Sequence, residues 1–332
     1  MEPVLEVRNL VTHYHTPRGP VKAVEEVSFQ LLPGQRYGLI GESGSGKSTI
    51  AYSLLRLIRP PGKVEAGEVL LDGVDLLTLS DEEMRQVRLA EMSLISQGAM
   101  NSLNPVIRIR RQMQDGFDSH GVDLSDEERD RRIEQLLTWV GLPAGVADMY
   151  PHQLSGGMKQ RVCIAIAVSL RPKVIIADEP TSALDVVVQR RVMQTLRHVQ
   201  EEIGAAVILI GHDMGLMAQF ADAIGVMYAG KLVEESPVAE LFTRPQHPYT
   251  QLLMESLPSL DQKESFQGVT GAPPSLLNPP SGCVFHPRCP YVMERCRVEV
   301  PLLQVTGDNH RAACHLLDEA PVPSAAAQEA TR

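Results

Sequence analysis

The 332 residues of the chain exceed the usual size of one domain, so we expect one large domain with a smaller appendage. Hydrophobic residues make up 43%, enough for a buried core, and the net charge of −10 argues against a nucleic-acid-binding protein, because phosphate contacts need a clustered excess of Lys and Arg. No apolar stretch reaches the roughly 18 to 20 residues that cross a bilayer, and the start of the chain lacks the features of a secretory signal. These features predict a cytosolic protein whose membrane contacts come through partners.

Short strands and one helix are predicted in the first sixty residues. Apolar and polar residues alternate at close to period two over residues 5–10 and 24–29, as they do in half-buried strands. Residues 37–40 form a short apolar strand that runs directly into a Gly-rich loop. A helix is expected next, over residues 47–58, ended by the prolines that follow it. The order is therefore strand, loop, helix.

The middle of the chain is predicted to be mostly helical, from about residue 98 to 170. Within it, one amphipathic helix is indicated by apolar residues at helical spacing, namely Ile133, Leu136, Leu137 and Val140. Strands return at residues 174–177 and 207–210. The helix between them is marked by its apolar positions Val188, Val192 and Leu196. An α/β core with an inserted helical subdomain fits this order.

The composition changes near residue 258, where a stretch rich in Pro, Gly and Ser has no sustained period. Four of the five cysteines lie just beyond it, so we expect a small separate Cys-rich module to begin there. The last stretch, residues 317–332, is expected to be disordered.

Residues Gly41 to Thr49 read GESGSGKST, which matches the phosphate-binding pattern G-x-x-x-x-G-K-[ST] and lies between a predicted strand and a predicted helix, as that motif requires. Glycines allow the backbone to curl so that its N–H groups face the phosphates, and the helix N-terminus adds a favourable dipole. Lys47 is expected to hold the β- and γ-phosphates, and Ser48 is expected to ligate Mg²⁺. The predicted nucleotide-binding residues of this loop are Gly41, Ser43, Gly44, Gly46, Lys47, Ser48 and Thr49.

Asp178 and Glu179 follow the apolar strand at residues 174–177, which should lie beside the phosphate-binding loop. Asp178 is placed to hold Mg²⁺, directly or through water, and Glu179 to accept a proton from an attacking water. An apolar strand that ends in two acidic residues is weak evidence by itself, because many strands leave a core in this way. Its weight comes from the motifs around it.

The segment LSGGMKQR, residues 154–161, places Ser155, Gly156 and Gly157 at the start of an apolar helix, which makes a second anion-binding helix N-terminus. With this segment the chain resembles the ABC ATPase family. In that family the signature binds the γ-phosphate of the nucleotide held by the opposite subunit. The resemblance covers roughly residues 4–243, and it implies that Ser155 and Gly157 contact the nucleotide of a partner in a head-to-tail dimer.

Further residues match positions of that family in the same order. Tyr14 resembles the aromatic residue that stacks on adenine, although a Tyr in a strand region also has an ordinary packing role. Gln97 matches the glutamine that contacts Mg²⁺ and the attacking water, and His212 matches the histidine that contacts the γ-phosphate and steadies that water. Asp185 matches the loop that communicates between the two sites. The chain departs from many members directly after Gln97, where a Gly-Ala pair at positions 98–99 replaces an acidic residue and proline.

The segment RPQHPYTQLLMESLP, residues 244–258, resembles the one that follows the nucleotide-binding domain in oligopeptide and dipeptide importer ATPases, with His247, Pro248 and Tyr249 as its core. An ordinary helix start after Pro248 explains the same residues equally well on physical grounds. The resemblance implies an ABC ATPase domain at 1–245 that contains a helical subdomain at about 98–170, an importer-type extension at 246–316, and a tail at 317–332.

The four clustered cysteines are Cys283, Cys289, Cys296 and Cys314, in the spacing C-x₅-C-x₆-C-x₁₇-C. In a cytosolic protein such a cluster suggests a metal before disulfides. The spacing lacks the C-x₂₋₄-C pairs common in zinc sites, while four cysteines also suit a [4Fe–4S] cluster. Similar cysteines in peptide-importer ATPases are associated with an iron–sulfur cluster, so the resemblance favours that cofactor, with zinc and no metal as alternatives. Cys163 is expected to be a small buried residue.

These features predict an ATP-binding and ATP-hydrolysing subunit that powers an ABC importer of oligopeptides or dipeptides, attached to the cytoplasmic face of the membrane. The resemblance implies as partners a second ATPase subunit, expected to be a paralogue, two integral membrane permease subunits and an external solute-binding protein, and no nucleic acid. Alternatives left open are an importer for a nickel chelate or an oligosaccharide, and a soluble ABC protein that moves a macromolecule. A regulatory subunit with an inactive site is disfavoured, because every expected catalytic residue type is present.

Overall fold

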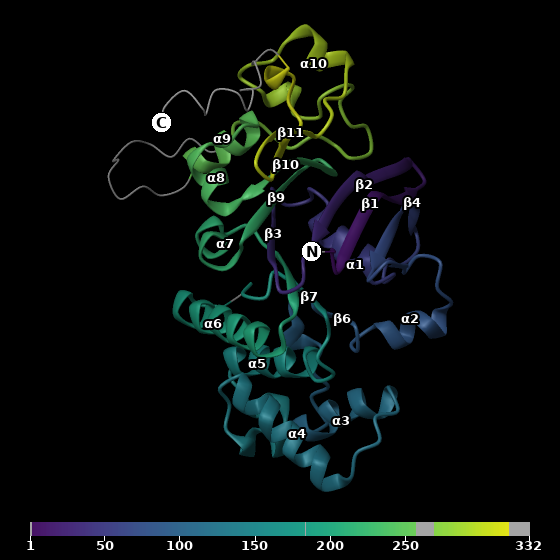
Figure 1. Cartoon of the computed structure of the whole chain (residues 1–332), viewed down its shortest axis with the longest axis vertical. Helices are drawn as coiled ribbons and strands as arrows, with labels where there is room; N and C mark the ends of the chain where they lie inside the picture. Colours follow the sequence, from purple (N-terminus) through teal and green to yellow (C-terminus); the bar gives the residue numbers. More distant parts are fainter. Residues whose placement is uncertain (1, 183, 257–268, 319–332) are drawn as a thin grey trace, which may run out of the picture.

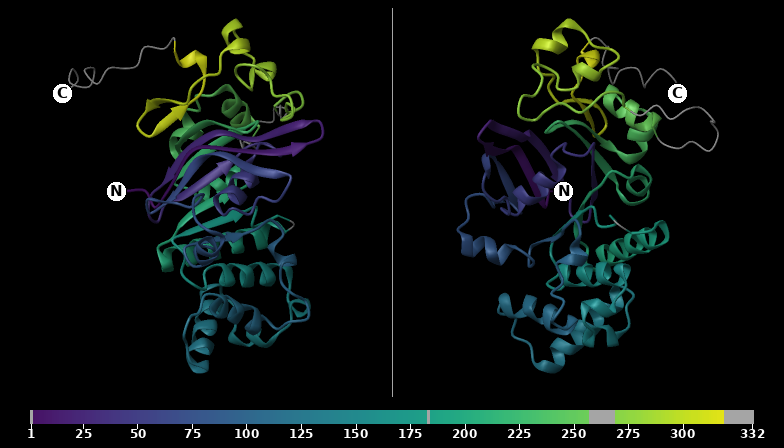
Figure 2. Two further views of the ribbon diagram at one scale, coloured as in Figure 1. Left: turned by 90° about the vertical axis from the view of Figure 1, so that its right-hand side faces the viewer. Right: turned by 180° about the vertical axis from the view of Figure 1, so that it is seen from behind.

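The computed structural model describes residues 2–182, 184–256 and 269–318, and three regions follow one another along the long axis of the molecule (Figure 1). Two sheets with their covering helices form the middle, a group of helices forms one end, and the Cys-rich C-terminal segment forms the opposite end. Figure 2 shows the same order from two further sides, with the N-terminal sheet beside the central sheet. No helix within the described ranges is long and apolar enough to cross a membrane.

The strands in the described part of the chain form two sheets. The N-terminal sheet is antiparallel, in the order β2 (Gly19–Leu31), β1 (Leu5–Thr16), β4 (Gly62–Leu71) and β5 (Val74–Asp75). The central sheet has the order β11 (Gln304–Gly307), β12 (His310–Ala312), β10 (Lys231–Pro237), β9 (Ala223–Tyr228), β3 (Arg36–Ile40), β8 (Ala206–Ile210), β7 (Val174–Asp178) and β6 (Met92–Ile95). The five strands from β9 to β6 are parallel.

The helices cover both faces of the central sheet and build the helical end. They are α1 (Lys47–Leu54), α2 (Asp81–Val87), α3 (Ile109–Ser119), α4 (Asp126–Trp139), α5 (Gly156–Ala167), α6 (Val186–Ile203), α7 (Met214–Phe220), α8 (Val238–Thr243), α9 (Pro248–Glu255) and α10 (Glu294–Val298). Single 3₁₀ turns lie at Ala99–Asn101, Ala144–Asp148, Pro151–Gln153, His286–Arg288 and His315–Leu317. An α/β fold with a helical region between β6 and β7 is therefore present, as the alternation of patterns predicts.

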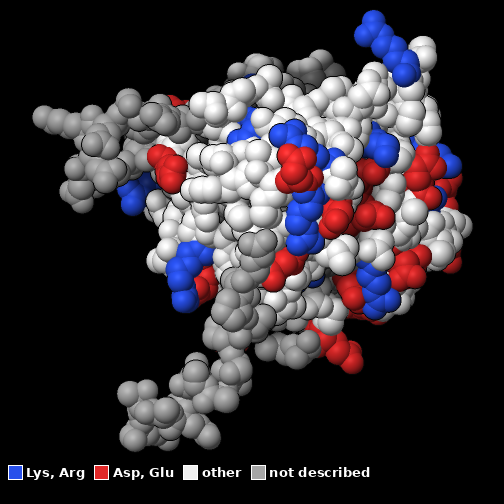
Figure 3. Space-filling model, turned by 90° about the horizontal axis from the view of Figure 1, so that it is seen from above, with Lys and Arg blue, Asp and Glu red and all other residues white. Residues whose placement is uncertain are grey.

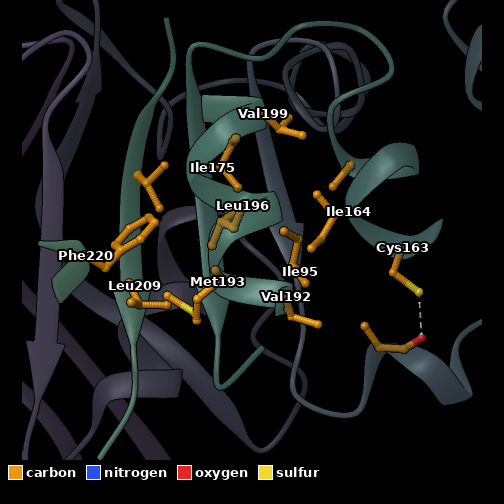
Figure 4. Packing of buried hydrophobic residues seen from close by; sticks show 14 of the residues in the cluster. Ile95, Cys163, Ile164, Ile175, Val192, Met193, Leu196, Val199, Leu209 and Phe220 are labelled. Atoms are coloured by element: carbon orange, nitrogen blue, oxygen red, sulfur yellow. Dashed lines mark hydrogen bonds between the residues drawn. The ribbon is translucent and has the colours of Figure 1, made fainter. Parts of the chain in front are cut away.

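The parallel strands are apolar throughout because both of their faces are buried. In β7, Val174 and Ile176 face the core shared with α1 and the N-terminal sheet, while Ile175 and Ala177 face the core shared with α5 and α6. The second core is seen in Figure 4, where Leu196 of α6 lies near Ile175. A strand with alternating polar and apolar residues would bury polar side chains on one of these faces. Short continuous apolar runs in the sequence therefore indicate the central strands.

Two sequence predictions about this core are confirmed. Ile133, Leu136 and Leu137 of α4 are fully buried, as is Val140, which follows the helix. Cys163 of α5 is 8% exposed, and its thiol donates a hydrogen bond to the carbonyl of Ala99 (3.2 Å; Figure 4). Burial raises the pKa of Cys163 to about 11, so this thiol is an unreactive part of the core.

The first helix is shorter than predicted. Helix α1 ends at Leu54, whereas the sequence predicts a helix to residue 58. Arg56 adopts a left-handed φ of 50°, which stops the helix, and the guanidinium of Arg88 donates to the carbonyls of Leu55 (2.9 Å) and Arg56 (3.1 Å). These carbonyls therefore find a partner outside the helix, in a side chain that local sequence does not reveal.

The Cys-rich segment is joined to the central sheet. Strand β12 pairs antiparallel with β10, so that Glu234 lies opposite Ala312 and Glu235 opposite Arg311. His310 of β12 contacts the buried Glu234 carboxylate (Nε2 to Oε1, 2.7 Å), and Arg311 donates to Glu235 (Nε to Oε2, 2.7 Å). The segment thus extends the ATPase sheet by two strands. Seen from this end, acidic and basic side chains are intermixed over a largely uncharged surface (Figure 3).

Two sequence predictions fall partly on residues outside the described ranges. The Pro-, Gly- and Ser-rich stretch that starts near residue 258 includes residues 257–268, and the tail predicted at 317–332 includes residues 319–332. Leu317 is described, and it ends the 3₁₀ turn His315–Leu317.

Candidate active site

The topology explains why residues from four distant parts of the chain meet. Strands β3, β8, β7 and β6 are parallel neighbours, so their carboxyl ends lie along the same edge of the sheet. The phosphate-binding loop follows β3, Glu179 follows β7, His212 follows β8 and Gln97 follows β6. In open α/β sheets, ligands bind at this edge. The predicted catalytic residues are therefore brought together by strand order alone.

Glycines shape the phosphate-binding loop for two different reasons. A Cβ atom at Gly41 would lie 2.1 Å from the carbonyl oxygen of Met227, and one at Gly46 would lie 2.2 Å from that of Ala23, so close packing requires glycine at both positions. Gly44, with a φ of 77°, has nothing within 4 Å of its Cβ position, and Ser43 beside it is exposed. The crown of the loop is thus open, which fits a loop whose N–H groups receive phosphates.

Lys47 lies across the inside of this loop. Its Nζ donates to the carbonyls of Gly41 and Glu42, both at 2.8 Å, and to the hydroxyl of Ser45 at 3.2 Å. Burial lowers the pKa of Lys47, and the carboxylates of Glu179, Asp178 and Glu42 act in the opposite direction. The ammonium group is held at the loop by backbone oxygens, in reach of the phosphates that such a loop binds.

Ser48 and Asp178 form the part of the site that suits a divalent cation. The Ser48 hydroxyl donates to Oδ1 of Asp178 at 3.0 Å, and Asp178 is only 1% exposed. Burial raises the pKa of Asp178, the bond from Ser48 lowers it, and the nearby Glu179 raises it further. Two adjacent hard oxygen donors fit the ligand preference of Mg²⁺.

Glu179 lies between Gln97 and His212, the two residues that the sequence predicts to act with it in ATP hydrolysis. Its Oε2 accepts a hydrogen bond from Nε2 of Gln97 at 2.8 Å, and its Oε1 lies 3.6 Å from Nδ1 of His212. The backbone of Glu179 is left-handed, with a φ of 45°, and its N–H donates to the carbonyl of Ile210 at 2.9 Å. A non-glycine residue held in this conformation costs about 1–3 kcal/mol, and such positions concentrate at active sites.

The remaining predicted residues lie apart from this cluster. Ser155 caps α5 by accepting a hydrogen bond from the N–H of Met158 (3.3 Å), and it is exposed together with Gly156. A Cβ atom at Gly157 would lie 2.6 Å from Val188 of α6, so packing restricts this position to glycine. The signature thus forms an accessible helix N-terminus in the helical region.

Tyr14, Asp185 and Gly98 also take defined places. Tyr14 lies in β1, and a Cβ atom at Gly62 would approach its ring within 2.6 Å, so the ring lies against the start of β4. Asp185 caps α6 by accepting from the N–H of Val188 at 3.0 Å. Gly98, which stands where many family members carry an acidic residue, has a left-handed φ of 68°, a conformation that glycine adopts without strain.

The four clustered cysteines line one small cavity in the C-terminal segment, together with His247, Phe285, His286 and His315. Burial raises the pKa of both Cys283 and Cys314 to about 11. Within the described residues, no three His, Cys, Asp or Glu side chains converge closely enough to hold a single metal ion. The cavity therefore brings four thiols together without the geometry of a preformed one-ion site.

Sequence reasoning missed two contacts on the phosphate-binding loop. Arg288 and Tyr249, both from the C-terminal part of the chain, bind Glu42. No spacing or periodicity links residues more than 200 positions apart.

Two family models match the chain. The model described as "ABC transporter" matches residues 24–182, and the one described as "Oligopeptide/dipeptide transporter, C-terminal region" matches residues 233–296. Among solved structures, the dimeric structure of the bacterial ABC transporter cassette MJ0796 is 29% identical, with a TM-score of 0.63, and covers 70% of this chain and 98% of its own. The structure of cbiO1 from Clostridium perfringens, part of the ABC transporter complex cbiONQ, is 25% identical with a TM-score of 0.63, and covers 74% of this chain and 92% of its own.

Curated relatives span nearly the whole chain. Proteins described as "Dipeptide transport ATP-binding protein DppD" are 41% identical over 322 residues in Caldanaerobacter subterraneus (96% of this chain, 98% of the relative) and 42% identical over 315 residues in Haemophilus influenzae (94% and 95%). The protein of the same description from Escherichia coli is 41% identical over 325 residues (97% and 99%). The motifs, the fold and these similarities agree, and the chain belongs to the ABC transporter ATP-binding proteins of the oligopeptide/dipeptide importer family.

Proposed function

We propose that this chain hydrolyses ATP at the carboxyl edge of its parallel strands to power the import of dipeptides or short oligopeptides. The observation that carries the proposal is the placement of the Glu179 carboxylate, hydrogen-bonded by Gln97 and next to His212, beside the phosphate-binding loop. Lys47 and the loop N–H groups hold the phosphates of ATP. Ser48, Gln97 and Asp178 are the residues that would hold Mg²⁺, and the bound ion would offset the charge on the phosphates.

Glu179 accepts a proton from the attacking water, and His212 and Gln97 orient that water. Gln97 is a neutral donor, so it fixes the direction of the Glu179 carboxylate without adding a positive charge that would weaken it as a base. Proximity and orientation supply much of the rate in phosphoryl transfer, because the protein forms no covalent bond to the phosphate. The left-handed backbone of Glu179 supports this assignment, since strain of this kind persists where a side chain must be aimed.

The signature residues act on the nucleotide of a second subunit. Ser155 and Gly157 lie at an exposed helix N-terminus, whose dipole favours an anion, and the description of a related cassette as dimeric supports a two-subunit arrangement. Tyr14 stacks on adenine, and Asp185 communicates between the two sites. The second subunit is a paralogous ATPase.

The other partners are two integral membrane permease subunits and an external solute-binding protein, and the assembly places this chain at the cytoplasmic face of the membrane. The relatives described as dipeptide transport proteins support dipeptides as cargo. Within the chain, residues 1–245 serve as the ATPase domain, with residues of about 98–170 as its helical subdomain, and residues 246–316 serve as the importer-type extension.

Cys283, Cys289, Cys296 and Cys314 bind a [4Fe–4S] cluster, with a zinc ion as the alternative. The cavity that the four cysteines share supports this assignment. Iron, sulfide and zinc analysis of anaerobically purified protein decides between them. A brown protein with iron and acid-labile sulfide supports the cluster, while a colourless protein with stoichiometric zinc contradicts it.

The test of the transport function is affinity purification of a Glu179→Gln variant from detergent-solubilised membranes with ATP present. This variant binds ATP without turning it over, so the closed assembly accumulates. Two integral membrane proteins and a second ATPase should co-purify, and a Lys47→Ala control should recover less of the second ATPase. Recovery of ribosomes or DNA-bound proteins in place of membrane proteins would support the soluble alternative instead.

A further inference from the structure

Glu42 of the phosphate-binding loop is held from outside the loop by the C-terminal part of the chain. Arg288 donates two parallel hydrogen bonds to its carboxylate, from Nη1 to Oε2 at 2.7 Å and from Nη2 to Oε1 at 2.9 Å. The backbone N–H of Glu42 donates to the hydroxyl of Tyr249 at 2.9 Å. A bidentate Arg–carboxylate pair fixes direction as well as distance, so both the side chain and the backbone of Glu42 are constrained.

Arg288 is itself rigidly placed. Its Nε donates to the carbonyl of Thr270 and its Nη2 to that of Val269, both at 2.9 Å, and Nη1 donates to the hydroxyl of Tyr228 at 3.2 Å. Its side chain is 6% exposed, and the hydrogen bonds that it donates to Glu42 raise the pKa of the guanidinium. A pair in this setting differs from an exposed ion pair, which contributes about 0–1 kcal/mol.

Aromatic packing gives Tyr249 a fixed position as well. Its ring lies 4.6 Å from that of Tyr228 and 5.4 Å from that of Phe285, centroid to centroid, and the Tyr228 and Phe285 rings meet edge to face at 5.1 Å. Tyr249 and Phe285 are completely buried. The hydroxyl that receives the Glu42 N–H is therefore presented by a packed cluster that spans the end of β9 and the C-terminal segment.

The contacts continue from Glu42 to the phosphate-binding lysine. The carbonyl of Glu42 accepts a hydrogen bond from Nζ of Lys47 at 2.8 Å. One residue thus connects three groups, with its carboxylate on Arg288, its N–H on Tyr249 and its carbonyl on Lys47. A shift of Glu42 changes the position of the loop and of the ammonium group that lies across it.

We propose that Arg288 and Tyr249 are positioning residues for the phosphate-binding loop, so that the C-terminal segment sets the affinity of this ATPase for nucleotide through Glu42. The inference rests on the proposed function, because it concerns the same nucleotide site. It assigns to the importer-type segment a part in ATP binding by its own subunit. Neither residue touches the reacting atoms, so substitution acts on binding more than on the chemical step.

The test compares nucleotide affinity and steady-state kinetics of the full-length protein. Arg288→Gln is expected to raise the Kd for ATP and the KM for ATP about five- to tenfold, with kcat little changed, because a bidentate charge-assisted contact is lost. Arg288→Lys is expected to recover part of the affinity, and Glu42→Gln to give a similar loss. The double variant Arg288→Gln/Glu42→Gln should bind ATP no more weakly than either single variant, since each substitution removes the same Arg288–Glu42 interaction.

Arg295→Gln is the matched control, because Arg295 lies in the same segment but pairs with Glu299 and Asp318, away from the loop. Tyr249→Phe removes only the hydroxyl that accepts the Glu42 N–H, so it tests the same inference if Arg288→Gln does not fold. Unchanged ATP affinity in the folded Arg288 or Tyr249 variants would overturn the inference while leaving the ATPase intact. Failure of the wild-type chain itself to bind ATP would instead overturn the proposed function.

Discussion

Gln97 donates a hydrogen bond from its side-chain amide to the carboxylate of Glu179 over 2.8 Å, although 82 residues separate the two in the sequence. Strands β6 and β7 are parallel neighbours, and these two residues follow their carboxyl ends. The loop that starts at Gln97 leads into the helical region, so Glu179, the proposed general base, is tied directly to the part of the molecule that carries residues 154–161. A movement of that region would therefore change the orientation of the Glu179 carboxylate.

Replacement of Glu179 by Gln should lower kcat by about 10²-fold or more while ATP binding is retained, because the amide cannot accept the proton of the attacking water. The Gln side chain keeps an oxygen that can accept the hydrogen bond from Gln97, so the shape of the site is preserved. Measurements of phosphate release and of nucleotide binding on the same preparation test whether kcat falls while ATP binding is retained. Glu201→Gln, at an exposed position of α6, is the control, and near-normal turnover by the Glu179 variant would refute the assignment.

Gly41 and Gly44 should respond differently to alanine. Gly41→Ala places a methyl group 2.1 Å from the carbonyl oxygen of Met227, so the loop must distort and the variant should lose both stability and nucleotide binding. Gly44→Ala has free space but a φ of 77°, so its folding cost should be about 1–2 kcal/mol.

The Gly44 methyl group would project from the open crown of the loop, where phosphates are expected. Nucleotide affinity should therefore fall in this variant more than its stability does. Thermal denaturation and ATP titration of both variants separate the two effects. Equal losses of stability in Gly41→Ala and Gly44→Ala would contradict the expected difference between the two positions.

Ser155→Ala should strongly reduce hydrolysis by the assembled transporter but leave the affinity of the isolated chain for ATP unchanged, because we propose that Ser155 contacts the nucleotide of the partner subunit. The variant also loses the cap of α5, which costs about 1 kcal/mol. Ser125→Ala removes the equivalent cap of α4 and so provides a control for stability. If both variants hydrolyse ATP at the same rate, Ser155 acts only as a cap; if affinity falls in the isolated chain, the assignment to the partner's site is wrong.

The buried pair of Glu234 and His310 should make stability sensitive to acid. Burial raises the pKa of the Glu234 carboxyl, but the hydrogen bonds from His310 and from the backbone of Gln246 and His247 outweigh it and hold the pKa below its usual 4.5. The unfolded chain then binds this proton more readily than the folded chain. The resulting stabilisation is present above about pH 4.5 and is lost as the pH falls through the lowered pKa.

Glu234→Gln should therefore reduce the free energy of unfolding near pH 7 by about 1–3 kcal/mol, and the difference from wild type should shrink below pH 4.5. Urea denaturation at several pH values measures this. Glu240→Gln, which breaks an exposed pair with Arg244, should change stability by less than about 1 kcal/mol at every pH. A difference that stays constant with pH would exclude titration of Glu234 as its cause.

The parts of this fold that follow from local pattern could be predicted from the sequence. The apolar runs of β3, β7 and β8, each followed by chemically distinctive residues, indicate parallel strands that share one edge, and Lys47, Glu179 and His212 meet there. The buried face of α4 follows from its periodicity. These features depend on residues close together in the chain or on a standard strand order.

Other features depend on contacts between residues far apart in the chain, and no local sequence pattern indicates them. The early end of α1 is stabilised by Arg88, more than thirty positions away, and the pairing of Glu42 with Arg288 spans 246 positions. The edge pairing of β12 with β10 was likewise invisible, because three residues of a strand carry too little pattern to reveal a partner. Such contacts can be identified only from the tertiary structure.

The three acidic residues Glu42, Glu234 and Glu235 each bind a basic residue of the C-terminal segment, namely Arg288, His310 and Arg311. The ATPase part of the chain and its C-terminal segment are consequently complementary at these three contacts. A chimera that joins this ATPase to the C-terminal segment of a distant relative would leave a buried carboxylate unpaired and the edge of β10 open. Functional exchange between relatives should therefore succeed only when these three pairs travel with the graft.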